Sequence, residues 1–139
     1  MRCAAVMLSV LLVIACGGSV PAMRITRFSA MTENHYPALD RSLADTAGAR
    51  RVFDAVKALP PAPKDRFCPA SFGLRYRLSF NEAARVSLSV VIEGDGCAEV
   101  AFSQSDRRAT DDAFWDLLAN VLAMKKAEIY FVLPDEMRR

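Results

Sequence analysis

The chain of 139 residues is long enough for one domain and too short for two of ordinary size. Hydrophobic residues make up 53% and charged residues 24%, which excludes disorder as the general state. The net charge of +2, with both signs interspersed, gives no basic stripe, so we expect no nucleic-acid partner. A single histidine, His35, excludes metal sites built from several imidazoles, and we predict no cofactor.

The N-terminal segment has the pattern of an export signal. A positive start at Met1-Arg2 precedes an apolar run over residues 4–15. A helix that crosses a bilayer takes about 20 residues, and a core helix is amphipathic, whereas this run is short and apolar on all sides. We therefore predict a signal peptide over residues 1–15.

The residues Val13-Ile14-Ala15-Cys16 resemble the lipobox of bacterial lipoproteins, in which an aliphatic, a variable and a small residue precede a cysteine. The resemblance implies a diacylglyceryl group on the Cys16 sulfur, cleavage just before Cys16, and fatty acyl chains such as palmitate that insert into the lipid bilayer. The protein would then lie on the extracytoplasmic side of a cell membrane or outer membrane. Residues 16–23 would comprise the lipidated cysteine and a tether that reaches about 25 Å.

Two alternatives remain open for this segment. A general signal peptide cut after Ala22 would discard Cys16, and a cytosolic or uncleaved protein would keep the whole segment. Each leaves the body of the chain, residues 24–139, as a single domain.

The first half of the body contains one clear helix. Residues 24–30 are predicted as a strand and 31–45 as a polar connection. Residues 46–59 form the helix, because Val52, Phe53, Val56 and Leu59 recur at helical spacing and Thr46 is placed to cap it. The four prolines of residues 60–71 predict a stiff loop.

The second half alternates clearly between apolar and polar residues. This period of two predicts half-buried antiparallel strands over 74–80, 86–92 and 97–102, joined by the turn at 94–96. An amphipathic helix over 110–126 follows, capped by Thr110 and ending at Lys125-Lys126. Residues 127–134 are predicted as a last edge strand.

The predicted fold class is therefore α+β: an antiparallel β-meander covered on one face by two helices, in the order β-α-β-β-β-α-β. In such a meander Cys68, before the first strand, and Cys97, at the start of the third, lie at the same end of the sheet. Export permits oxidation, so we predict a disulfide that contributes about 3.5 kcal/mol. The alternative is two buried free thiols.

The motifs "CPASFGLRYRLSF", "GDGC" and "AFWDLL" resemble small bacterial secreted or lipoprotein domains with the pattern C-P-x-x-x-G-x-x-Y-x-L-x-F, over residues 49–122. The resemblance implies the same fold and disulfide, and no assigned activity.

No catalytic constellation is apparent, and we predict that the protein is not an enzyme. His35 lies in a polar loop without a nucleophile nearby, and Trp115 is expected in the core. The outward-facing Arg75 and Arg77, with Arg85 close by, are candidate binding residues for an acidic partner.

The expected function is therefore that of a lipid-anchored, non-catalytic binding or envelope protein with an envelope or secreted protein as partner. The alternative is an inhibitor of a secreted hydrolase. In that case prolines and a disulfide would pre-organise Lys64 to Arg66 for insertion into the hydrolase.

Overall fold

A computed structural model describes residues 22–82 and 85–138 of the chain. The predicted signal peptide, the lipobox-like residues and Cys16 lie outside the described residues.

Six strands form one antiparallel sheet, in the order β2-β1-β3-β4-β5-β6. The strands are β1 (Ala22–Ser29), β2 (Asp40–Leu43), β3 (Leu74–Glu82), β4 (Arg85–Glu93), β5 (Glu99–Ala101) and β6 (Arg107–Ala109). The long strands β1, β3 and β4 are the centre of the sheet, and β2 and β6 are its edges. The predicted first strand is therefore a central strand, beginning two residues earlier than expected.

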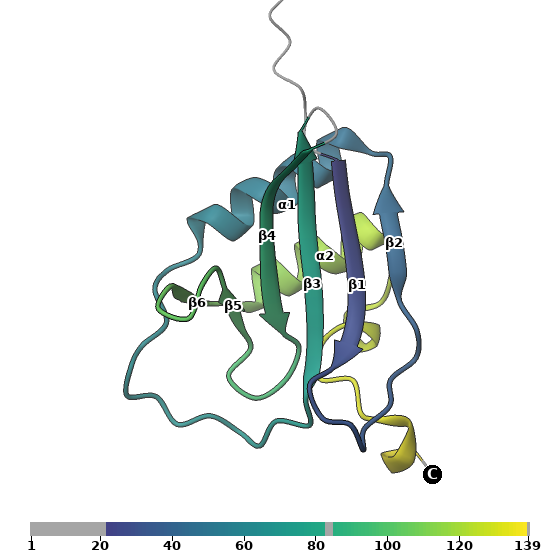
Figure 1. The fold of residues 1–139 in the computed structure, drawn as a ribbon, viewed down its shortest axis with the longest axis vertical. Coiled ribbons are helices and arrows are strands. Elements are labelled where there is room, and N and C mark those ends of the chain that lie inside the picture. Colours follow the sequence, from purple (N-terminus) through teal and green to yellow (C-terminus); the bar gives the residue numbers. More distant parts are fainter. Residues whose placement is uncertain (1–21, 83–84, 139) are drawn as a thin grey trace, which may run out of the picture.

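Two helices, α1 (Thr46–Ala58) and α2 (Asp112–Leu122), pack behind the sheet, where both lie on the same face (Figure 1). Short 3-10 helices follow at Lys126–Glu128 and Asp135–Met137. The predicted fold class, an antiparallel sheet covered on one face by two helices, is confirmed.

The core lies between the helices and the inward side chains of the sheet. The predicted alternation of β3 is confirmed, since Leu74, Tyr76, Leu78 and Phe80 are all fully buried. The alternation of β4 is confirmed only in its second half, because Val86 is 63% exposed near the hairpin tip. From α2, Trp115 is buried as expected, and its ring stacks on that of Tyr130.

Both helix caps differ from the prediction by one residue. Asp45, not Thr46, caps α1, and Asp111, not Thr110, caps α2 through its carboxylate and the Phe114 amide. A carboxylate at this position also interacts favourably with the helix dipole. The Thr110 hydroxyl instead accepts a hydrogen bond from the indole nitrogen of Trp115 at 3.0 Å.

The predicted C-terminal strand over 127–134 is wrong, and so is the extension of the second helix to Lys125-Lys126. The helix ends at Leu122, because Ala123 takes a left-handed conformation with φ of 51°. Beyond it, Phe131 also has a positive φ, of 52°, and its amide donates to the carbonyl of Gly94 instead of to a strand ladder.

Two short strands were missed. Residues 40–43, predicted as connection, form β2, and β6 follows β5 directly. The observed order is thus β-β-α-β-β-β-β-α, and the sheet gains an edge strand on each side.

Candidate functional site

An irregular segment of 14 residues, 60–73, runs across one end of the sheet (Figure 1); we call it the disulfide loop. Its first residues line the outer edge of β6. The Ala109 amide donates to the Pro60 carbonyl, and the Ala62 amide donates to the Arg107 carbonyl, both at 2.9 Å. The stiff loop expected from the prolines is therefore attached to the sheet from its start.

Cys68 in the middle of the loop is bonded to Cys97, with 4.8 Å between the two Cα atoms. This confirms the predicted disulfide. Cys97 belongs to the tight turn between β4 and β5, in which Gly96 and Ala98 both have positive φ, of 60° and 52°. The bond therefore ties an exposed loop to a sharply turned, conformationally restricted part of the backbone.

Arg66 fixes the loop on the N-terminal side of the disulfide. Its guanidinium donates to the Cys97 carbonyl at 2.5 Å and to the Glu99 carboxylate at 2.9 Å. The side chain is only 26% exposed, so the expectation that Arg66 is presented for insertion is wrong. Arg66 instead faces the sheet, where its guanidinium pairs with the Glu99 carboxylate.

Phe67 is the residue that the loop presents instead. Its side chain is 96% exposed, the highest value among the large hydrophobic residues that the structure describes. Pro69 and Ala70 are also exposed. Alternation about the inward-pointing Cys68 would have predicted this arrangement, with residues 67 and 69 facing solvent.

Asp95 fixes the loop on the C-terminal side of the disulfide. Its carboxylate accepts hydrogen bonds from the Ser71 hydroxyl and the Phe72 amide, both at 2.8 Å. It also accepts one from the Leu74 amide at 3.3 Å. Asp95 is only 1% exposed, so these donors replace the water that a buried carboxylate lacks.

A row of alternating charges on the open face of the sheet runs from Arg66 to Asp95, the two residues that hold the disulfide loop. We call it the charged row; its members are Arg66, Glu99, Arg107, Glu93, Arg75 and Asp95. Arg107 donates to both Glu99 and Glu93 at 2.5 Å. Burial raises the pKa of Glu99, but the hydrogen bonds and charges of Arg107 and Arg66 outweigh it, and the net pKa lies below its usual value.

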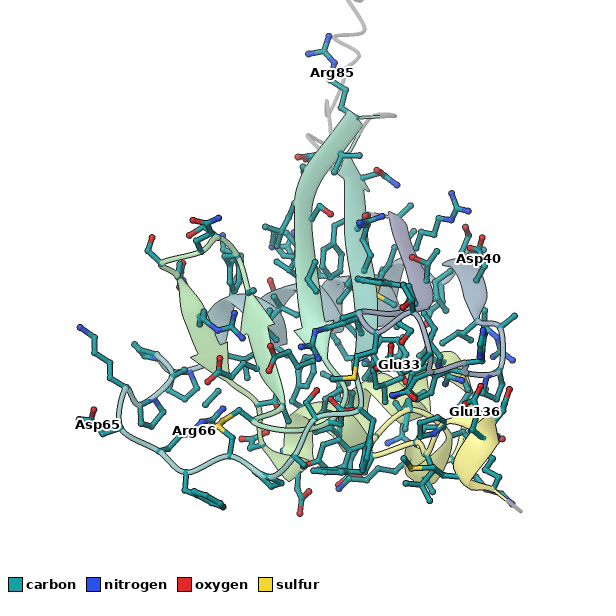
Figure 2. All side chains as sticks on the ribbon, turned by 60° about the horizontal axis from the view of Figure 1, so that its bottom comes forward. Glu33, Asp40, Asp65, Arg66, Arg85 and Glu136 are labelled. Atoms are coloured by element: carbon teal, nitrogen blue, oxygen red, sulfur yellow. A yellow bond between two sulfur atoms is a disulfide. The ribbon has the colours of Figure 1, made fainter. Side chains whose placement is uncertain are left out.

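The three candidate arginines for an acidic partner do not form one cluster. Arg75 is 20% exposed and pairs with Glu93 and Asp95, so its charge is largely compensated. Arg77 is exposed and lies over the Phe28 ring, 5.5 Å from its centroid. Arg85 is exposed at the opposite end of the hairpin (Figure 2). Binding of an acidic partner by these residues stays a prediction.

His35 pairs with a carboxylate near the C-terminus, which the sequence did not indicate. Its Nδ1 lies 2.5 Å from Glu136, and both side chains are exposed. A hydrogen bond from its own backbone amide and the contact with His35 lower the pKa of Glu136 to about 2. The pair joins the 31–39 connection to the C-terminal segment.

A hollow of about 570 Å³ lies between β2 and the segment that follows α2. The guanidinium groups of Arg27 and Arg41 at this hollow donate to backbone carbonyls of Pro37, Glu128 and Leu122. These two guanidinium groups therefore help to hold the C-terminal segment against the sheet.

Over residues 22–82 and 85–138, no three His, Cys, Asp or Glu side chains gather as a metal-binding group. In the same part of the chain, no helix is long and apolar enough to cross a membrane. Comparison with protein-family models, curated proteins and solved structures finds no match.

Proposed function

We propose that this protein is a lipid-anchored, non-catalytic binding protein of the cell envelope, with the disulfide loop as its binding element. The observation that carries the proposal is the exposed stretch Phe67–Ala70, which is restrained on both sides by buried polar contacts. A large aromatic side chain that is almost fully exposed has no role in the core, and such residues are enriched among binding anchors. The lipobox-like Val13–Cys16 supports the anchoring.

The partner that fits this loop best is a secreted peptidase, so we propose inhibition of such an enzyme as the activity. Peptidase clefts bind extended peptide segments, and residues 67–70 belong to no helix or strand, with Phe67, Pro69 and Ala70 exposed. The disulfide and the contacts of Arg66 and Asp95 order the loop before binding, which lowers the entropy cost of association.

The position of the disulfide also suits a segment that enters a peptidase cleft. A cut anywhere between Cys68 and Cys97 leaves the two fragments covalently joined. The charged row and the sheet hold both fragments in place, so that the cleaved bond stays close to its original position. Slow cleavage without separation of the fragments is therefore compatible with lasting inhibition.

The first test is a panel of extracellular serine, cysteine and metallopeptidases assayed with micromolar protein. We expect inhibition of at least one peptidase, and we expect Phe67→Ala to weaken it at least tenfold, because truncating a well-packed aromatic anchor costs about 2 kcal/mol. Val86→Ala is the matched control, since it removes an exposed apolar side chain at the other end of the molecule. No inhibition across the panel, or equal loss in both variants, would contradict the proposal.

Mass spectrometry of the peptidase mixture then identifies the contact region. We expect any single cut to fall within residues 67–71. For a cut after Cys68, the fragments separate on a gel only after reduction. Cleavage only outside the disulfide loop would show that another part of the chain enters the cleft.

A further inference from the structure

The chain enters the domain at the end of the sheet opposite to the disulfide loop. β1 begins at Ala22, which pairs with Asn81 near the end of β3. At the other end of β1, Ser29 pairs with Leu74, where the disulfide loop joins β3. With a rise of about 3.3 Å per residue, the eight residues of β1 separate these two ends by about 25 Å.

At the end where the chain enters, the β3–β4 hairpin has the last residues of β3 and the first residues of β4. Arg85 pairs with Glu82 across this hairpin, and Val86 follows it. Both Arg85 and Val86 are exposed. Figure 2 shows Arg85 at one extreme of the molecule, far from Asp65 and Arg66. A cationic and an apolar side chain together are suited to a surface of anionic lipid headgroups.

The short tether restricts how the domain can turn. Five residues separate Cys16 from Ala22, and this stretch reaches about 20 Å when fully extended. An inverted domain, with the disulfide loop on the membrane, would place Ala22 about 25 Å or more above the surface. The tether is too short for that arrangement.

We infer that the anchored protein stands on the β3–β4 hairpin end, with Arg85 and Val86 at anionic headgroups. The disulfide loop then faces the aqueous space, and its partner is a freely diffusing peptidase. This inference rests on the proposed anchoring at Cys16 and adds the orientation and the kind of partner.

Short-range quenching on vesicles tests the orientation. The full lipoprotein is labelled with a fluorophore at a new cysteine, Val86→Cys or Lys64→Cys, and reconstituted in phosphatidylglycerol vesicles that carry a nitroxide on the headgroup. In the mature protein Cys16 is acylated and Cys68 and Cys97 are bonded, so the new thiol alone reacts. Each labelled protein on vesicles without the nitroxide gives the baseline.

We expect strong quenching at position 86, baseline intensity at position 64, and weaker quenching at position 86 on zwitterionic vesicles. We also expect the vesicle-bound protein to inhibit a soluble peptidase as well as its Cys16→Ser form does. Vesicle flotation reports anchoring separately. Floating protein with equal quenching at both positions, or with inhibition lost on vesicles, would overturn the orientation and leave the anchoring intact; protein that does not float would overturn both.

Discussion

Two acidic residues, Asp95 and Glu99, hold the disulfide loop from the two sides of the disulfide. Asp95 is nearly inaccessible and accepts three hydrogen bonds from residues 71–74. Glu99 is shared by Arg66 and Arg107. Their roles were invisible in the sequence, where both are single charges beside a turn, because only the fold brings residues 66 and 71 next to them.

Replacing Asp95 by Asn tests the first of these contacts. The amide keeps the size of the side chain but turns one acceptor into a donor that faces another donor. We expect the free energy of unfolding to fall by about 2–3 kcal/mol in urea titrations and the loop to become more sensitive to proteolysis. Asp65→Asn, in the exposed part of the loop, is the control and should leave both measurements unchanged. Equal behaviour of the two variants would remove Asp95 from its proposed role.

The pH dependence of stability tests the second contact. Because the folded pKa of Glu99 is below the usual 4.5, the pairs with Arg66 and Arg107 stabilise the protein above that pH, and this stabilisation is lost as the pH falls through the lower, folded value. We expect Glu99→Gln to cost about 2 kcal/mol at pH 7 and progressively less in acid. The exposed Glu33→Gln serves as control. If the difference in unfolding free energy between the wild type and Glu99→Gln stays constant from pH 7 to pH 2, the lowered pKa of Glu99 is contradicted.

At the scale of elements, the sequence was most informative where burial follows a strict period. β3 shows this period because its inward residues from Leu74 to Phe80 are all buried, and its prediction was right. β2 and β6 have the sequences Asp-Arg-Ser-Leu and Arg-Arg-Ala, which carry no apolar alternation because edge strands are largely exposed.

For residues 127–134 the error is the reverse, because a strand was predicted and none forms. Most of them are apolar, and Val132 is buried between exposed neighbours, as in a strand. However, the positive φ of Phe131 breaks the extended backbone, and the Ile129 carbonyl accepts from the Tyr76 hydroxyl instead of from a strand. No local pattern could have indicated this backbone conformation or this tertiary contact.

The order of the disulfide loop and part of the stability of the fold depend on the Cys68–Cys97 bond. We expect the double change Cys68→Ser and Cys97→Ser to lower the free energy of unfolding by about 3.5 kcal/mol, because the unfolded chain regains the freedom of a loop of about 30 residues. Urea unfolding measures the loss, and hydrogen exchange should rise in residues 66–72 while β3 stays protected. A loss of 1 kcal/mol or less would show that the polar contacts alone hold the loop.

At the scale of the whole molecule, the proposals depend on where the mature chain begins. We expect the wild-type protein to fractionate with membranes and to carry the mass of a lipidated Cys16, and Cys16→Ser to be soluble and unlipidated. Fractionation and intact mass spectrometry measure this. If the wild type and Cys16→Ser are both soluble and both begin at Met23, the alternative cut after Ala22 is supported. If Cys16→Ser remains in the membrane at the mass of the wild type, lipidation of Cys16 is contradicted.

The start of the disulfide loop has a second effect on the molecule. The backbone along Pro60–Ala62 occupies the outer side of β6, and its two prolines have no amide hydrogen to offer to a further strand. A strand of a second copy of the chain therefore cannot pair with this edge of the sheet. If the proposed anchor gathers several copies on a lipid surface, these copies therefore cannot join through their β6 edges, and Phe67 of each stays accessible.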